Sequence, residues 1–211
     1  MSILSDISQK LQEGKAKDVK ALVEQAVSEG ISAKKILEEG LLPGMNTVGE
    51  KFKNNEVYVP EVLIAARAMK SGTDTLKPYL QSENVKPLGK VCLGTVKGDL
   101  HDIGKNLVKM MMEGKGIEVV DLGVNVEVEK FLEAVKEQGC TIVACSALLT
   151  TTMGSMKEVV DLFAAEGLRD KVKIMIGGAP ITDAYCKQIG ADGYAADAAS
   201  AADLAAEWLT N

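Results

Sequence analysis

One histidine, His101, occurs in the chain, and it lies in the polar segment KGDLHDIGKN that runs from residue 97 to residue 106. Any chemistry that needs an imidazole must therefore use His101, and a zinc site built on two or three histidines is excluded by counting. Asp99 stands two residues before it, so a carboxylate accompanies the imidazole. A lone histidine is more often structural than a ligand, and the interpretation therefore depends on what else gathers near it.

Two further segments combine small and polar residues that a ligand can contact. The run SALLTTT begins at Ser146 and ends at Thr152, and the pair Gly177-Gly178 follows another apolar stretch. Taken singly, hydroxyl groups before a helix act as N-caps and a glycine pair makes a turn. All three segments, however, directly follow stretches that we predict to be parallel strands, whose carboxyl ends meet at one edge of the sheet. Their convergence predicts a ligand site at that edge.

The elements that must position these segments are strands and helices that alternate in the second half of the chain. Short, largely β-branched stretches predict buried parallel strands at Val91–Val96, Ile117–Leu122, Ile142–Cys145 and Val172–Ile176, with a weaker one near Asp192–Ala195. Helices are expected near residues 104–113, 128–138, 153–165, 182–188 and 198–209. This alternation predicts an α/β fold, with a flavodoxin- or Rossmann-like doubly wound parallel sheet of five strands.

The first part of the chain predicts a four-helix bundle. Apolar residues recur at helical spacing, with interruptions at Gly14 and Gly30. A third helix is expected to begin after Ser32 and to be kinked or broken at Pro43-Gly44, and a fourth is expected to begin at Pro60. The aperiodic segment QSENVKPLG, residues 81–89, is typical of a linker. We therefore expect a helical bundle domain at 1–88 and an α/β domain at 89–211.

Composition narrows the functional classes. The chain has 24 Lys and Arg against 30 Asp and Glu, and this net charge of −6 argues against binding to nucleic acid or to an anionic membrane. No apolar run approaches the length that spans a bilayer, and the start lacks the features of a signal peptide, so we expect a cytoplasmic protein. The four cysteines form no CxxC pair, and we expect them to be buried free thiols.

Three motifs in order carry a family resemblance. Asp99-x-His101-x-x-Gly104, Ser146-x-Leu148 and Gly177-Gly178 match the cobalamin-binding signature D-x-H-x-x-G…S-x-L…G-G. The chain resembles, nearly end to end, the small corrinoid proteins that serve methylamine, methanol and methoxyaromatic methyltransferase systems. Its two expected domains are similar to the cap and cobalamin-binding domains of methionine synthase. The resemblance implies cobalamin or a related cobamide as the cofactor.

The resemblance also implies a role for each motif residue. In this family the lower base of the cobamide leaves cobalt and a protein histidine takes its place, so His101 is the expected axial ligand. Asp99 is expected to hold the other imidazole nitrogen, and Thr152 stands where the family often has a serine that completes this relay. The remaining residues expected to contact the cofactor are Asp102, Ile103 and Gly104 beside the histidine, Ser146 at the displaced base, Leu148, Thr150 at the corrin periphery, Gly177 and Gly178 along the nucleotide tail, and Tyr58 over the upper face of the corrin.

The function that the resemblance implies is that of a carrier subunit. One substrate:corrinoid methyltransferase would place a methyl group on cob(I)alamin, and a second methyltransferase would move it from methylcob(III)alamin to tetrahydrofolate or a thiol coenzyme, with a reductive activase as a further partner. Two alternatives are the small subunit of an adenosylcobalamin-dependent mutase and a cobalamin-sensing regulator. The N-terminal bundle disfavours the first, and the lack of a basic recognition helix disfavours the second.

Overall fold

The computed structural model describes residues 2–211, and the chain divides into two compact units. The first comprises residues 2–87 together with 114–116, and the second comprises residues 88–113 and 117–211. Within the described residues, no helix combines the length and the apolar character needed to cross a bilayer.

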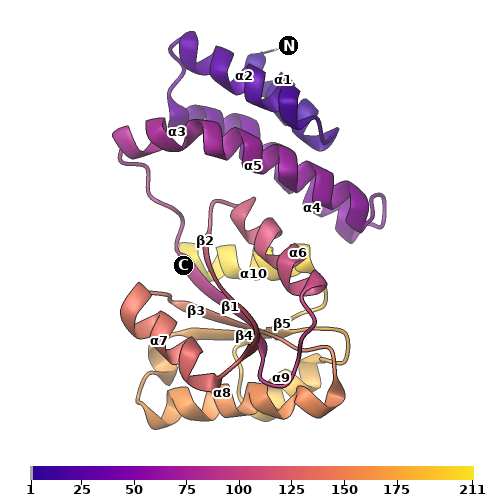
Figure 1. Cartoon of the computed structure of the whole chain (residues 1–211), viewed down its shortest axis with the longest axis vertical. Helices are drawn as coiled ribbons and strands as arrows, with labels where there is room; N and C mark the ends of the chain where they lie inside the picture. Colours follow the sequence, from indigo (N-terminus) through magenta and orange to yellow (C-terminus); the bar gives the residue numbers. More distant parts are fainter. Residues whose placement is uncertain (1) are drawn as a thin grey trace. The chain divides into compact units, whose positions relative to one another are not determined.

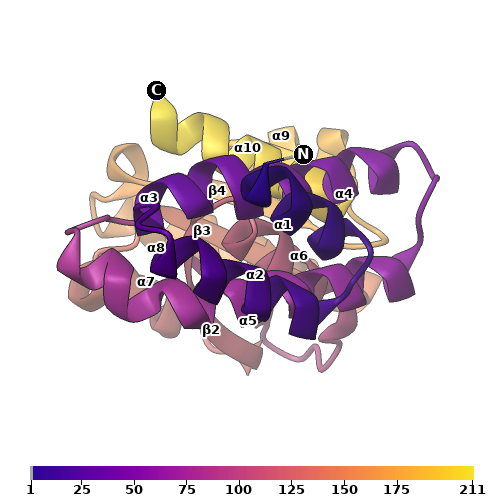
Figure 2. The same cartoon turned by 90° about the horizontal axis from the view of Figure 1, so that it is seen from above.

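The first unit is helical, which confirms the predicted bundle. Figure 2 shows α2 lying along α5 and α1 lying along α4. The apolar faces of these helices meet in a core that includes Ile7, Leu11, Val23 and Leu76, all fully buried. In chain order the segments are α1 (Ile3–Gln12), α2 (Ala16–Ser28), α3 (Ala33–Ile36), the π-helical segment η1 (Leu37–Leu41), α4 (Leu42–Lys53) and α5 (Val59–Ser82).

The third predicted helix is not broken at Pro43. The chain stays helical from Ala33 to Lys53, with η1 immediately before α4. Proline lacks an N–H, and in a regular helix its ring clashes with the carbonyl four residues earlier. The wider turn of η1 accommodates that clash, so the helix continues. Close packing of α4 on α1 favours glycine at 44, because a Cβ there would lie 3.0 Å from the carbonyl oxygen of Ser8.

Helix α5 runs further than the sequence suggests, since it includes Pro78 and ends at Ser82. The irregular connection therefore begins at Glu83. The carboxylate of Glu83 accepts hydrogen bonds from the backbone N–H groups of Ala33 and Lys34 at 2.7 and 3.0 Å. It thereby caps the N-terminus of α3, where backbone donors have no partner within the helix.

The second unit contains a parallel sheet in the order β2-β1-β3-β4-β5, which confirms the predicted doubly wound α/β fold. Helices α6 and α10 cover one face of the sheet, and α7, α8 and α9 cover the other (Figure 1). The strands are β1 (Lys90–Val96), β2 (Glu118–Val126), β3 (Ile142–Ser146), β4 (Lys173–Gly177) and β5 (Gly193–Ala195). The helices are α6 (Ile103–Glu113), α7 (Val128–Gln138), α8 (Gly154–Ala165), α9 (Asp183–Ile189) and α10 (Ala198–Thr210), with short 3-10 turns η2 (Thr150–Thr152) and η3 (Arg169–Lys171).

The core of this unit holds few aromatic side chains, of which Phe131 on α7 and Phe163 on α8 are fully buried. Val, Ile, Ala and Cys from the strands fill most of the rest. All four cysteines are buried free thiols, as expected. The one clear difference from the predicted strands is at β2, which extends to Val126 instead of ending at Leu122.

Candidate functional site

The site lies where β1, β3 and β4 end. Thr95 is the register partner of Ser146, and Ser146 is the partner of Gly177, so the three strand ends are level. The loops that follow them therefore emerge side by side at the carboxyl edge of the sheet. In this strand order the chain switches direction between β1 and β3, and such a switch point is where open α/β sheets bind ligands.

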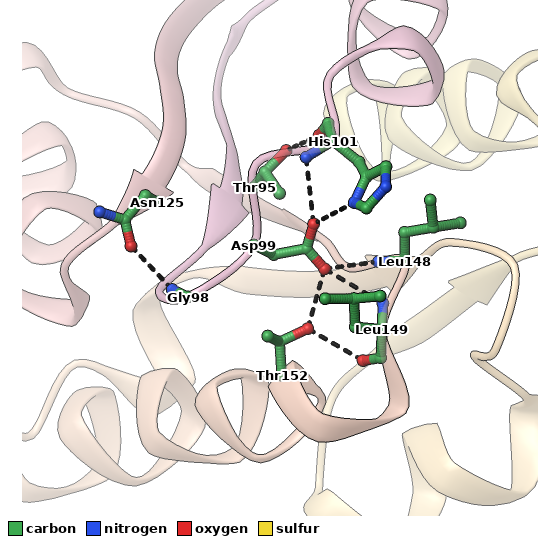
Figure 3. Close-up of polar contacts among 8 residues, drawn as sticks. All are labelled: Thr95, Gly98, Asp99, His101, Asn125, Leu148, Leu149 and Thr152. Carbon is green, nitrogen blue, oxygen red and sulfur yellow. Dashed lines mark hydrogen bonds and ion pairs between the residues drawn. The ribbon is translucent and has the colours of Figure 1, made fainter.

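Asp99 is the centre of the polar contacts in these loops (Figure 3). Its side chain is completely buried, and both of its carboxylate oxygens accept hydrogen bonds. Oδ2 accepts from the backbone N–H groups of Leu148 at 2.8 Å and Leu149 at 3.1 Å, and it lies 2.8 Å from the Thr152 hydroxyl. Oδ1 accepts from the backbone N–H of His101 at 3.1 Å and lies 2.9 Å from its Nδ1. One carboxylate thus joins the loop after β1 to the loop after β3.

These contacts keep Asp99 ionised. Burial by itself raises the pKa of the Asp99 carboxyl, but the hydrogen bonds from Leu148, His101 and Thr152 outweigh burial and hold the pKa well below its usual range. An ionised carboxylate only accepts hydrogen bonds, so Nδ1 of His101 must carry a proton. In the neutral ring the lone pair then lies on Nε2, on the side of the imidazole away from Asp99 (Figure 3).

The surroundings of His101 are apolar and open. Half of its side chain is exposed, and Leu100 and Ile103 on either side of it are 72% and 75% exposed. Leu148 and Leu149 from the next loop are also exposed. Large exposed apolar side chains on the same two loops as a single nitrogen donor suit a large, flat, mostly apolar group with one metal at its centre. The donor set therefore fits the corrinoid that the motifs imply.

Gly104, in the first turn of α6, adds to this fit, because a Cβ built there meets no atom of the described chain within 4 Å. Gly178 behaves differently. Its φ is +126°, and a Cβ there would lie 1.8 Å from the carbonyl oxygen of Ala147. Glycine at 178 is thus required by the approach of the two loops themselves, whereas at 104 the space beside the backbone is open.

The other residues expected to contact the cofactor are distributed over the same edge, with one exception. The backbone carbonyl oxygen of Asp102 accepts a hydrogen bond from the backbone N–H of Asn106 at 2.7 Å, the first such bond of α6. Ser146 ends β3 half-buried, Gly177 ends β4, and Thr150 is exposed in η2. Tyr58 belongs to the helical unit, where it precedes α5 and is 64% exposed. The geometry thus brings together the expected residues between Asp99 and Gly178, whereas Tyr58 belongs to the other unit.

Three residues that hold the His101 loop were missed by the sequence reasoning. The buried hydroxyl of Thr95 donates to the carbonyl oxygen of His101 at 2.8 Å. Asn125 contacts Gly98, and the nearly buried Lys105 contacts Asp121 at 2.6 Å. Two of these contacts involve Asp121 and Asn125 of β2, which lie near the end of the predicted strand and beyond it. A strand that ends in polar residues and glycine, DLGVN, was the available signal.

Comparison with known proteins agrees with this geometry. Residues 89–203 match a family described as "B12 binding domain", and residues 3–77 match a second family with the same description. The dimethylamine corrinoid protein of Methanosarcina barkeri is 41% identical over 208 residues, which are 98% of this chain and 97% of the relative.

Two solved structures are similar along nearly the whole chain. A novel cobalamin-binding protein from Desulfitobacterium hafniense DCB-2 is 34% identical, with a TM-score of 0.82, over 97% of this chain and 98% of that one. A chain of the methanol:cobalamin methyltransferase complex MtaBC from Methanosarcina barkeri is 30% identical, with a TM-score of 0.86, over 99% of this chain and 80% of that one. The two-part match, the fold and the donor set agree: this chain belongs to the family of cobalamin-binding corrinoid proteins.

Proposed function

We propose that this chain carries a methyl group on a bound cobamide, which His101 ligates through Nε2 in place of the lower base. The observation that supports this most is the arrangement of Asp99 and His101, in which a buried carboxylate holds Nδ1 of a half-exposed ring. When bound, the cobamide supplies a cobalt centre that accepts a methyl group from a donor and releases it to an acceptor. The chain is then a carrier subunit and does no chemistry on the methyl donor itself.

In this proposal Asp99 and Thr152 orient the ligand. By accepting a hydrogen bond from Nδ1, Asp99 fixes the tautomer and raises the basicity of Nε2, as carboxylates behind metal-bound histidines do. The N–H groups of Leu148 and Leu149 and the hydroxyl of Thr152 keep the carboxylate from turning. The ring is thereby oriented before the metal arrives, which lowers the entropy lost on binding.

The remaining residues of the edge would contact the periphery of the cofactor. We assign the Ser146 hydroxyl to the displaced lower base, Thr150 to the rim of the corrin, and Gly177 and Gly178 to the nucleotide tail. Asp102, Ile103 and Gly104 lie directly after the ligand and would face the ring with Leu148. The exposed apolar side chains among them would exclude water from the lower face of the corrin.

We assign to the helical unit the role of covering the upper face. Tyr58, Leu63 and Ile64 are its large exposed apolar side chains near the start of α5, 64%, 39% and 45% exposed, and Ile64 lies beside Gly14 of the same unit. Met69, further along the same helix, is almost fully buried in the core of the bundle. The covering role therefore falls to Tyr58 and Leu63.

The partners follow from the carrier role. A substrate-specific methyltransferase would deliver the methyl group, and the similarity to a chain of the methanol:cobalamin methyltransferase complex supports such a partner. A second methyltransferase would take the group to its acceptor, and a reductive activase would restore the reactive cobalt. Relatives that cover nearly the whole chain are named for different methyl donors, dimethylamine at 41% identity and methanol at 30% identity. We therefore place specificity for the methyl donor in the partner.

The presence of one histidine makes a labelling experiment decisive. The full-length protein is produced with histidine labelled with nitrogen-15, loaded with a cobamide, reduced to the Co(II) form and measured by electron paramagnetic resonance. We expect the axial nitrogen splitting to change from a triplet to a doublet, because the nuclear spin of the ligand atom changes. The lower base of the cobamide keeps its ordinary nitrogen, so an unchanged triplet would identify the base as the ligand and refute the proposal.

The carrier role needs a separate measurement. The upper ligand retained by the protein as purified from its source under anaerobic conditions in the dark can be identified by mass spectrometry. A methyl ligand is expected. An adenosyl ligand would instead indicate radical chemistry of the mutase type and would overturn the carrier role while leaving His101 as the metal ligand.

A further inference from the structure

Strand β2 becomes irregular where it passes the His101 loop. One step along β1, from Leu93 to Gly94, is matched by two steps along β2, from Asp121 to Gly123. The next pairing, between Val96 and Val126, again leaves an extra residue on β2. β2 thus carries two bulges in its last residues. Bulges turn side chains away from their regular direction, and they are over-represented next to functional sites.

Asn125 lies in the second of these bulges. Its φ is +51°, a left-handed conformation that is unfavourable for most residues and that asparagine tolerates better than other side chains except glycine. The conformation persists because Asn125 makes two hydrogen bonds to the loop after β1. Its Oδ1 accepts from the backbone N–H of Gly98 at 2.8 Å, and its own N–H donates to the carbonyl oxygen of Asp99 at 2.9 Å.

These contacts act on the main chain of the loop, whereas Asp99 acts on the ring of His101. The main chain at Gly98 needs such support, because Gly98 has a φ of +82° and glycine is the most mobile residue of a loop. Figure 3 shows Asn125 on the side of Gly98 that faces away from His101. On the other side, the Thr95 hydroxyl holds the carbonyl oxygen of His101. The main chain of the loop is therefore held at both ends by strands, whereas the ring of His101 is held through the contact of Nδ1 with Asp99.

We propose that Asn125 is a positioning residue for His101: it fixes the main chain of residues 98 and 99, so that the imidazole binds and releases the metal by movement of its side chain alone. The proposal rests on the ligand role of His101 proposed above. A residue of β2, far from His101 in sequence, would then help to position the metal ligand. Asn125 itself touches neither the ring nor, in this proposal, the cofactor.

Three variants of the full-length protein test this. Asn125→Gly keeps the left-handed backbone and its N–H but removes the acceptor for Gly98. Asn125→Asp keeps an acceptor oxygen at the same place and tolerates the same φ, so it should restore the wild-type behaviour. Asn55→Gly is the matched control, since Asn55 has a φ of +58° in a turn of the helical unit. It changes the same residue type in the same conformation, far from the loop in sequence.

The first readout is amide hydrogen exchange of the cofactor-free protein by NMR. In Asn125→Gly we expect exchange at Gly98 to increase about three- to tenfold, the range that corresponds to loss of one ordinary hydrogen bond. Exchange at Leu148, which is held by Asp99, should stay as in the wild type, and Asn55→Gly should change neither amide. Unchanged exchange at Gly98 in Asn125→Gly would overturn the proposal.

The second readout is the Co(II) spectrum of the cobamide-loaded variants made with nitrogen-15 histidine. Asn125→Gly should show a smaller fraction of molecules with the histidine doublet, and Asn125→Asp should restore that fraction. If the wild type shows the doublet and Asn125→Gly keeps it at full fraction, the positioning role of Asn125 is refuted and that of His101 stands. If the wild type itself shows no doublet, the ligand role of His101 is refuted, and this inference fails with it.

Discussion

Nδ1 of His101 lies 2.9 Å from Oδ1 of Asp99, and the two side chains differ sharply in exposure, since Asp99 is completely buried and half of His101 is exposed. A charge-assisted hydrogen bond between a fixed carboxylate and an accessible ring restrains the ring without hiding its second nitrogen. The stabilising contacts of the pair lie on the buried side, through Leu148, Leu149 and Thr152. Orientation of the His101 ring and stability of the two loops therefore depend on the same carboxylate.

Asp99→Asn should disturb both the orientation of the His101 ring and the stability of the two loops. Each carboxylate oxygen faces only donors, so the NH₂ group of an asparagine meets N–H or O–H groups in either orientation. We expect a loss of about 1–3 kcal/mol in the free energy of unfolding, the range for a buried polar group left unsatisfied. Urea unfolding of the cofactor-free protein measures this. Asp170→Asn, an exposed aspartate in η3, is the control and should leave stability unchanged.

A second consequence of Asp99→Asn concerns the ring. If the NH₂ group faces His101, Nδ1 must accept and the proton moves to Nε2, so the nitrogen that we propose as the metal ligand loses its lone pair. The histidine doublet in the labelled Co(II) spectrum should then shrink. A full doublet together with wild-type stability would show that the carboxylate is not needed for either task.

Asp121 at the end of β2 gives a pH-dependent prediction. Burial alone raises the pKa of Asp121, but its hydrogen bonds from Lys105, Gly123 and Lys109, and the positive charge of Lys105, lower it overall. A carboxyl whose pKa is lower in the folded state stabilises the protein above its unfolded pKa of about 4, and this stabilisation is lost as the pH falls toward the folded pKa. The contribution is therefore complete at neutral pH and declines below about pH 4.

Asp121→Asn should lower stability by about 1–3 kcal/mol at pH 7, because the nearly buried ammonium of Lys105 loses its charged partner. The difference from wild type should become smaller between about pH 4 and pH 3. Asp161→Asn removes an exposed carboxylate from an ion pair along one helix, with Lys157, and should have little effect at either pH. A stability difference for Asp121→Asn that is independent of pH would contradict the charge argument.

The parts of this molecule that sequence predicts well are those that local pattern determines. β-branched stretches located the strands to within a few residues, and the order of strands and helices placed the loops of Asp99, Ser146 and Gly177 at one edge. The motif residues from Asp99 to Thr152 do converge there. Local pattern also predicted buried free cysteines, which the structure confirms.

The parts that sequence does not predict depend on contacts between distant segments. From the sequence alone, Asn125 is predicted to lie beyond the end of a strand. Only the pairing with β1 shows that β2 continues past it through two bulges. A lysine in a helix is ordinarily expected to be solvated, yet Lys105 is buried, because the carboxylate of Asp121 from β2 balances its charge. Pro43 is predicted to kink or break a helix, but in the packed bundle a π-helical turn precedes it and the helix continues.

Tyr58→Ala should expose the bound methyl group if the helical unit covers the corrin. The protein is loaded with methylcobalamin and illuminated, and loss of the cobalt–carbon bond is followed by its absorption spectrum. We expect faster loss in Tyr58→Ala, because a covered methyl radical recombines with cobalt before it escapes. Tyr79→Ala is the matched control, since Tyr79 is a 44%-exposed tyrosine near the other end of α5. Equal rates in both variants would remove Tyr58 from the covering role.

Gly178→Ala tests the contact between the loops after β3 and β4. The φ of +126° is unfavourable for alanine, and its Cβ would lie 1.8 Å from the Ala147 carbonyl oxygen, so the backbone must move. We expect destabilisation of at least about 1–3 kcal/mol, the range for backbone strain of this kind. Thermal unfolding of the cofactor-free protein measures it. A variant as stable as the wild type would show that the two loops do not approach as closely as described.

Gly104→Ala separates binding from folding at the same edge. Gly104 lies in the first turn of α6, and a Cβ there meets nothing within 4 Å in the described chain. Alanine favours the helical backbone, so the cofactor-free variant should be as stable as the wild type or more stable by up to about 1 kcal/mol. If the corrin lies against this turn, the added methyl group meets the ring, and affinity for cobamide, measured by titration of the absorption spectrum, should fall. Unchanged affinity would place the ring elsewhere along the edge, because a methyl group cannot be added to a close contact without effect.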